Sequence, residues 1–151
     1  MSCCDLLEDY QYFQGIGTYK LHTRGATFFR ARQICKEEGG HLAIINSLAE
    51  EKVLLDLFKR PEKFVNVMSN ERALLGIHDI FAEGEWETIF GQSLYRTGFS
   101  KWSNNWNGQP DDSKHILNCG FLLKSGGLDD DLCDAQHPFF CEIPEYCVAY
   151  L

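Results

Sequence analysis

The chain has 151 residues, of which 44% are hydrophobic and 24% are charged, a size and composition typical of one soluble domain around a single core. Its net charge is −8, and its 14 lysines and arginines form no basic run, so a polyanion such as nucleic acid would be repelled. No stretch approaches the roughly 18 consecutive apolar residues of a membrane helix. We therefore expect no membrane insertion.

Seven cysteines in a chain of this length favour an oxidising compartment, so we expect a secreted, extracellular protein. A bridge from Cys119 to Cys133 would close a local loop, and one from Cys35 to Cys141 would tie an early helix to the last strand. The remaining cysteines are Cys3, Cys4 and Cys147. Because their number is odd, one thiol is left unpaired or bonds to a second chain, which allows a homodimer.

No internal repeat or long linker divides the sequence. We predict an N-terminal extension over residues 1–16, one domain over 17–143 and a C-terminal tail over 144–151. Within the domain, Thr27 is an expected N-cap for a helix over 28–38, which Gly39-Gly40 would end.

The next element expected is a short strand over 41–45. Ser47 and Glu50 then form a capping-box pattern that opens a second helix, and Pro61 ends it. The side chains of this helix that face inward are expected to be Val53, Leu54, Leu57 and Phe58. Later strands are predicted over 74–78, 86–90, 119–123 and 139–143. Two helices followed by several strands indicate an α+β fold.

A stretch rich in Ser, Asn, Gly and Asp lies between Phe90 and Cys119 and shows no clean periodicity. A loop of this length is uncommon in a compact domain unless it has a function. Acidic residues cluster in it at Asp111-Asp112, and again after it at Asp129-Asp130-Asp131. Clustered carboxylates in turn-rich sequence are what a hard divalent cation needs.

Several short motifs occur in one order along the chain. They are Tyr19-Lys20-Leu21, the helix ending in Cys35, Gly40 through Ser47, Leu75-Gly76-Ile77, Gln109-Pro110-Asp111, Asn118-Cys119, Cys133 and Cys141. Together they resemble a C-type lectin domain over about residues 17–143. The segment Gly15 to His22, with Gly84-Glu85-Trp86, is most similar to the insect haemolymph lectins, which recognise microbial surface sugars.

This resemblance implies a C-type lectin-like fold, with two helices packed on short antiparallel sheets and a long calcium-binding loop. It implies the disulfides Cys35–Cys141 and Cys119–Cys133. It also implies a principal Ca²⁺ and sugar site formed by Gln109, Asp111, Asp129 and Asp130. In the family a tripeptide with a central cis-proline aims two side chains at the ion, and the form Gln109-Pro110-Asp111 accompanies galactose-type preference. A sugar with two vicinal hydroxyls can replace waters around such an ion.

A second calcium site of the family corresponds to Asp79, Glu83, Asp112 and Asn118, all of which carry oxygen. Two positions of the principal site depart from the family pattern. Leu117 stands where a carboxylate is usual, and Asp129 stands where an amide is usual. An ionised aspartate cannot donate a hydrogen bond to a sugar, so we expect binding weaker than in a complete site. For aromatic stacking on the sugar, the candidates are His115 and Trp106.

The resemblance implies carbohydrate binding, galactose-type or microbial, and no enzymatic activity. One alternative is a lectin-like domain that binds protein, lipid or ice without calcium, which Leu117 and Leu128 favour. Another is a hydrolase or a zinc site on His78, His115 and His137, but the sequence contains no HExxH or GxSxG motif.

Overall fold

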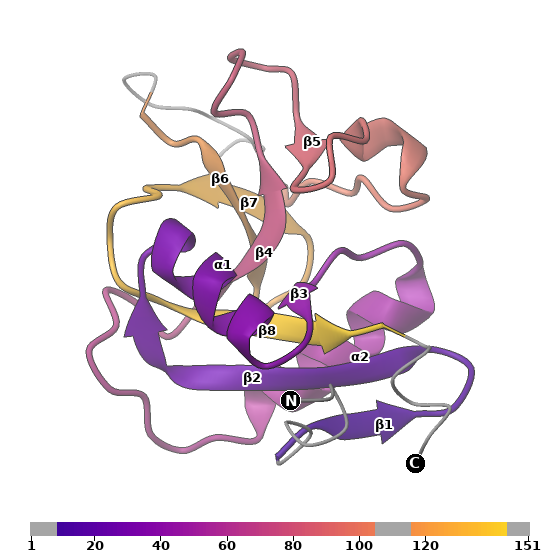
Figure 1. The fold of residues 1–151 in the computed structure, drawn as a ribbon, viewed down its shortest axis with the longest axis vertical. Coiled ribbons are helices and arrows are strands. Elements are labelled where there is room, and N and C mark those ends of the chain that lie inside the picture. The colour runs from indigo at the N-terminus through magenta and orange to yellow at the C-terminus, as the bar shows by residue number, and fades with distance from the viewer. Residues whose placement is uncertain (1–8, 105–115, 145–151) are drawn as a thin grey trace.

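The computed structural model describes residues 9–104 and 116–144 (Figure 1). Its strands are β1 (Gln11–Phe13), β2 (Gly17–Ala26), β3 (His41–Leu42), β4 (Arg72–His78), β5 (Glu87–Thr88), β6 (Cys119–Leu123), β7 (Leu128–Asp131) and β8 (His137–Ile143). Its helices are α1 (Phe28–Glu37), α2 (Leu48–Lys59) and the short 3₁₀ helix η2 (Leu94–Arg96). The strands form one eight-stranded sheet in the order β1-β2-β8-β4-β6-β7, with β3 paired to β8 and β5 paired to β4. This arrangement confirms the α+β class.

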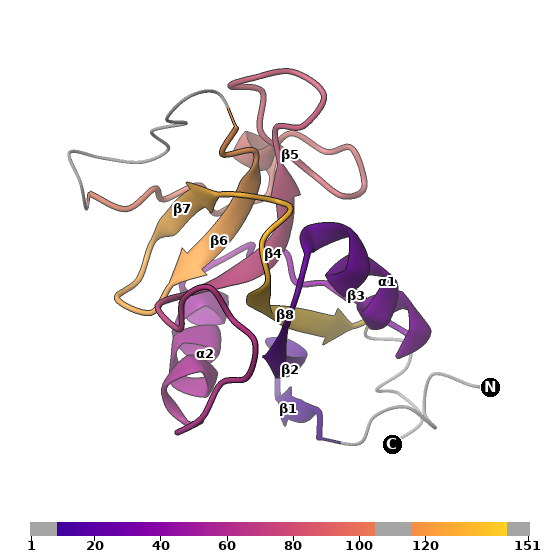
Figure 2. The same ribbon diagram turned by 90° about the vertical axis from the view of Figure 1, so that its left-hand side faces the viewer.

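Strand β8 joins the two halves of the sheet. On one side it pairs antiparallel with β2, and Thr18 lies opposite Ile143. On the other side it pairs parallel with β4, where Leu74 lies opposite Phe139. Beyond β4, strands β6 and β7 continue the sheet in antiparallel pairs. Figure 2 shows β7 and β6 on one side of β4, and α1 on the other.

Both helices begin where the sequence predicts. The Thr27 hydroxyl accepts a hydrogen bond from the N–H of Arg30 at 3.2 Å, and Gly39 follows α1 with a φ of 89°. The Ser47 hydroxyl accepts from the N–H of Glu50 at 3.1 Å. Glu50 itself accepts from the N–H of Asn46 at 2.5 Å, one residue earlier than in an ordinary capping box.

The apolar side chains form two clusters because consecutive residues of a strand point to opposite faces. The cluster that α2 covers includes Leu54, Phe58, Leu75, Leu122 and Phe140. The cluster that α1 covers includes Phe28, Ala31, Leu74, Phe121 and Phe139. The sheet is therefore buried on both faces, and one helix lies on each.

Two disulfides link the elements. Cys35–Cys141 ties α1 to β8, and Cys119–Cys133 ties the start of β6 to the segment after β7. These are the pairings implied by the resemblance. The other cysteines, Cys3, Cys4 and Cys147, lie outside the described residues.

Some strands differ in extent from the prediction. The strand expected over 41–45 stops at Leu42 because Ala43 bonds to two different strands: its N–H donates to Phe140 and its carbonyl accepts from Gly76. The strand expected over 86–90 is only β5, because the chain turns at Thr88, whose carbonyl accepts from Gly91. Strands β1, β2 and β7 were not predicted. Strand β1 lies within the segment predicted as an N-terminal extension.

Candidate calcium and ligand site

Strand β7 carries three consecutive aspartates, and all of them are buried. Asp129 and Asp130 are 2% exposed and Asp131 is 6% exposed. The strand pairs with β6, so that Asp129 lies opposite Phe121 and Asp131 lies opposite Cys119. A carboxylate removed from water requires a counter-charge or hydrogen-bond donors, and β7 therefore concentrates negative charge at the edge of the sheet.

Arg72, the first residue of β4, supplies positive charge to two of these aspartates. Its Nη1 lies 3.1 Å from Oδ2 of Asp129 and 2.5 Å from Oδ2 of Asp131. Burial raises the pKa of Asp129 to about 6, and Arg72 opposes that rise. One guanidinium thus faces two carboxylates, which leaves this part of β7 with an excess of negative charge.

Asp130 lies on the other face of β7, because neighbouring residues of a strand alternate. Asp129 and Asp130, which the resemblance assigns to one ion, are therefore adjacent in the backbone but differ in surroundings. Asp129 forms an ion pair with Arg72 on the face that α1 covers. The face of Asp130 is the one that also carries Leu128 and the α2 cluster.

Residues on both sides of the undescribed segment 105–115 are fixed at this edge of the sheet. On one side, the N–H of Ser103 donates to the carbonyl of Leu128 at 2.8 Å, and Trp102 packs edge-on against Trp86 at 4.8 Å. On the other side, the carbonyl of Asn118 accepts from the N–H of Asp79 at 3.0 Å. Gln109, Asp111 and Asp112 lie outside the described residues, as do His115 and Trp106.

Three of the four residues predicted for the second site lie near one another. Asp79 follows the end of β4, is 2% exposed, and accepts a hydrogen bond through Oδ2 from the N–H of Gly84 at 2.8 Å. Glu83 precedes Gly84 in the same turn, and Asn118 precedes β6 beside Asp79. The structure thus gathers oxygen-bearing side chains at the ends of two paired strands.

The donor chemistry of both groups of residues fits calcium, which binds carboxylate, amide and backbone oxygens. The zinc alternative is not supported by the described histidines. His137 bonds through Nε2 to the carbonyl of Leu132 at 2.9 Å and packs on Phe121. Among the described residues, the His22, Glu38 and Cys141 group has metal-like spacing, but Cys141 is in a disulfide and offers no thiolate.

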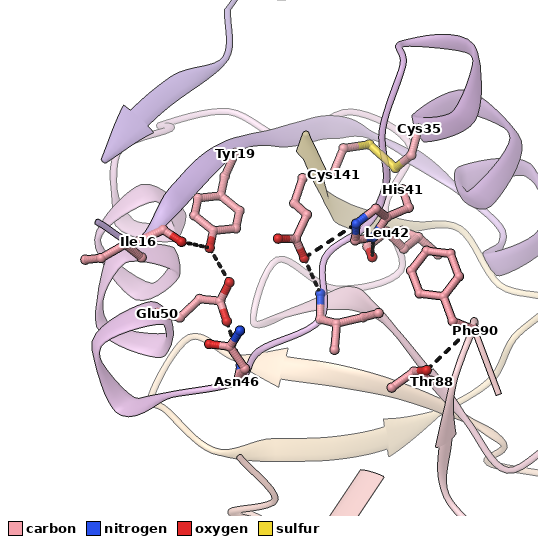
Figure 3. A network of polar contacts seen from close by, with 12 residues as sticks. Ile16, Tyr19, Cys35, His41, Leu42, Asn46, Glu50, Thr88, Phe90 and Cys141 are labelled. Carbon is pink, nitrogen blue, oxygen red and sulfur yellow. Dashed lines mark hydrogen bonds and ion pairs between the residues drawn. A yellow bond between two sulfur atoms is a disulfide. The ribbon is translucent and has the colours of Figure 1, made fainter. Parts of the chain in front are cut away.

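A buried polar network, which sequence analysis did not reveal, lies between β2, α2 and β8 (Figure 3). The Tyr19 hydroxyl donates to the carboxylate of Glu50, and Glu142 accepts from the N–H of Ile44 at 2.8 Å. Burial raises the pKa of Glu50, and it raises the pKa of Glu142 to about 8. The one local signal was Glu50 at the capping-box position, which also places its carboxylate beside Tyr19.

Residues 24–143 match the family model of the Lectin C-type domain. The chain belongs to the C-type lectin domain family. The resemblance to insect haemolymph lectins is confirmed by the hemolymph lipopolysaccharide-binding protein of Periplaneta americana, which is 44% identical over 134 residues. The alignment covers 89% of this C-type lectin domain chain and 52% of the relative, so the chain spans about half the length of that protein.

Solved C-type lectin structures have the same fold. The carbohydrate-recognition domain of cow CD23, determined in the presence of a GlcNAc2Man3 oligosaccharide, is 26% identical with a TM-score of 0.70, covering 89% of this chain and 92% of that one. A calcium-independent type II antifreeze protein is 20% identical with a TM-score of 0.68, covering 89% and 90%. Members of the C-type lectin domain family are binding proteins rather than enzymes. Among the described residues of this domain, no helix is both long and apolar enough to cross a bilayer.

Proposed function

We propose that this domain binds carbohydrate through calcium, at the edge of the sheet formed by β7, whose first residue, Leu128, accepts a hydrogen bond from Ser103 shortly before the segment 105–115. The observation that supports this most directly is the burial of three consecutive carboxylates, those of Asp129, Asp130 and Asp131, on the edge strand β7. Carboxylates in this state favour a nearby divalent cation. A calcium ion supplies coordination positions that vicinal sugar hydroxyls can take.

The proposed ligands of the principal ion are Gln109, Asp111, Asp129 and Asp130, with galactose-type or microbial glycans as the sugar. A second ion is proposed for the group Asp79, Glu83, Asp112 and Asn118. The 44% identical relative is named as a hemolymph lipopolysaccharide-binding protein. That name supports secretion and a role in immune recognition of microbial surfaces.

Arg72 limits the contribution of Asp129 to calcium binding. Its guanidinium is 3.1 Å from the Asp129 carboxylate, so an ion bound there shares Asp129 with a fixed positive charge. Like charges repel across such a distance even at the surface of a protein. We therefore propose that Asp130 contributes more to calcium affinity than Asp129 does.

The test uses Asp130→Ala with Asp134→Ala as its matched control. Asp134 is exposed and follows Cys133, so its loss removes the same charge outside the proposed site. Calcium-dependent retention on a galactose matrix should disappear for Asp130→Ala and persist for Asp134→Ala, with both variants folded by circular dichroism. Retention that survives in Asp130→Ala would remove the proposed site. A glycan array with and without calcium would identify the sugar.

A second candidate is calcium-independent binding of protein or lipid. It is favoured by the half-buried Leu117, which has no oxygen to offer, and by the ion pair that already engages Asp129. The calcium-independent antifreeze protein has this fold as well. If a chelator changes neither thermal stability nor glycan retention, this second candidate is correct.

A homodimer joined through Cys3, Cys4 or Cys147 also stays a proposal. These cysteines lie outside the described residues. Electrophoresis of the full chain without reducing agent should show a band of twice the monomer mass that disappears when a reductant is added.

A further inference from the structure

A cleft of about 370 Å³ lies between the end of α1 and the turn after β5. Its lining residues include Arg32, Lys36, His41, Ile89 and Phe90. Figure 2 shows α1 and β7 on opposite sides of β4, and no residue of the acidic strand lines the cleft. It combines two cationic side chains with an exposed aromatic ring, in a chain whose net charge is −8.

The two cations are one helical turn apart on the same side of α1. Arg32 is positioned by a hydrogen bond from Nη2 to the carbonyl of Ile89 at 3.3 Å. A guanidinium has five N–H donors, so this one bond holds the group across the cleft and leaves donors for an anion. Lys36, in the last turn of α1, adds a second positive charge.

The end of a helix presents carbonyl oxygens, which would repel an anion. At the end of α1, three of the last four carbonyl oxygens accept backbone hydrogen bonds. The N–H of Glu38 donates to Ile34, that of Gly39 to Lys36, and that of Gly40 to Cys35. These backbone donors offset part of the negative field of the helix end next to the two cations.

Glu142 is an acidic side chain that lies close to His41, one of the residues lining the cleft. Oε1 of Glu142 lies 4.0 Å from Nε2 of His41, and burial raises the pKa of Glu142 to about 8. Near pH 7 most of this carboxyl is protonated. Burial also lowers the pKa of His41, so His41 contributes a flat neutral ring rather than a charge.

The other wall of the cleft is apolar. Phe90 is 67% exposed, and its ring meets the ring of His41 edge-on at 4.9 Å (Figure 3). The N–H of Phe90 donates to the Thr88 hydroxyl at 3.1 Å, which fixes the turn that presents the ring. An exposed phenylalanine next to two cations is suited to a ligand that carries both an anion and a hydrocarbon body.

The geometry points to a second binding site, in which this cleft takes a phosphorylated amphiphile without calcium. The phosphate contacts Arg32 and Lys36, and the alkyl chain lies against Phe90 and Ile89. Two positive charges match a phosphomonoester, which carries about −1.5 to −2 at pH 7, and arginine binds its oxygens in a fixed geometry. The site is independent of the sugar site proposed above, because it shares no residue with it.

The test is calorimetric titration of the full chain with dodecyl phosphate below its micelle concentration, in EDTA. Dodecyl glucoside provides the same chain without charge, and inorganic phosphate provides the charge without the chain. We expect dodecyl phosphate to bind at least tenfold more tightly than either. Equal affinity for dodecyl glucoside, equal affinity for inorganic phosphate, or binding only after calcium is added would overturn the proposal.

Three variants separate the contributions of the two cations and of the aromatic ring to dodecyl phosphate binding. All three change exposed side chains. Arg32→Gln and Lys36→Gln should each weaken dodecyl phosphate binding about tenfold, the size expected for a lost charge-assisted hydrogen bond. Phe90→Ser should weaken it while leaving affinity for inorganic phosphate unchanged. Arg30→Gln is the matched control, because Arg30 is on the same helix but bonds to Gln33 and Glu37. If Arg30→Gln weakens binding as much as Arg32→Gln, dodecyl phosphate responds to the overall positive charge of the helix. The proposed cleft would then not be the binding site.

Discussion

Arg72 and Asp129 belong to strands that are not neighbours, because β6 lies between β4 and β7, yet their side chains form an ion pair of 3.1 Å. The same guanidinium contacts Asp131. Arg72 therefore ties the acidic strand to the centre of the sheet. This pair also couples the proposed calcium site to the stability of the fold.

Replacing Arg72 by glutamine should lower the free energy of unfolding in EDTA by about 3 kcal/mol, because two buried carboxylates lose their shared counter-charge. The deficit should shrink when calcium is added, since a divalent ion would then balance the aspartates. Urea unfolding with and without calcium measures both values.

Arg60→Gln is the control for that experiment. Arg60 pairs with Asp56 on the exposed side of α2, and such pairs contribute about 0.5 kcal/mol or less. An Arg72→Gln deficit of equal size in EDTA and in calcium would contradict the link between this arginine and the ion.

Leu117→Glu should tighten calcium binding, because it adds an oxygen at the position where the family pattern has a carboxylate. Titration calorimetry would report the gain. Ile116→Glu is the matched control: it adds the same charge one residue earlier, at a side chain that is 50% exposed. If both variants tighten binding equally, net charge rather than coordination is responsible.

The partly buried Glu142 should make stability depend on pH. Its pKa rises from an ordinary value of 4.5 to about 8 on folding, chiefly through burial. Between these two values the folded state holds a proton that the unfolded state has released, so this stabilising contribution is present below about pH 4.5 and is lost as pH rises towards 8.

Glu142→Gln mimics the protonated carboxyl and can still accept from the N–H of Ile44. We expect its stability relative to the wild type to increase from pH 5 to pH 8 by roughly 3.5 kcal/mol. Urea unfolding at the two pH values gives the difference, and Glu62→Gln, at an exposed residue, should show no such change. A Glu142→Gln variant with the same pH profile as the wild type would show that this carboxyl is ionised when folded.

The two disulfides should differ in their effects on thermal stability and on calcium binding. Cys35–Cys141 encloses 106 residues and Cys119–Cys133 encloses 14, so chain entropy assigns them about 4.7 and about 3 kcal/mol. Alanine replacement of the first pair should cost more in thermal stability. Replacement of the second should weaken calcium binding more, because that disulfide lies beside Asn118 and the end of β7. The reverse order in either measurement would contradict this division.

Local signals in the sequence predicted the helices well. Thr27 and Ser47 cap them with hydrogen bonds that span only three residues, so their pattern is visible in a short segment. The acidic strand β7 was not predicted, because aspartate is disfavoured in strands. What permits it is Arg72, which lies 59 residues away from Asp131 in the sequence. No local pattern contains that contact.

Contacts between residues far apart in the sequence also explain why the sequence did not predict the polar network of Glu50 and Glu142. Glu142 is stabilised by the N–H of Ile44 across 98 residues, and Glu50 by Tyr19 across 31. For the second predicted site, the family resemblance named Asp79 and Asn118 among four residues, and the structure places the backbones of these two in contact. The opposite facing of Asp129 and Asp130 follows only from the pairing of β7 with β6.

The pairing of Thr18 with Ile143 places the start of β2 beside the end of β8. From β8, strand β7 is three strand spacings away, about 14 Å. The acidic strand is therefore separated from the strand that ends the sheet in sequence by β4 and β6.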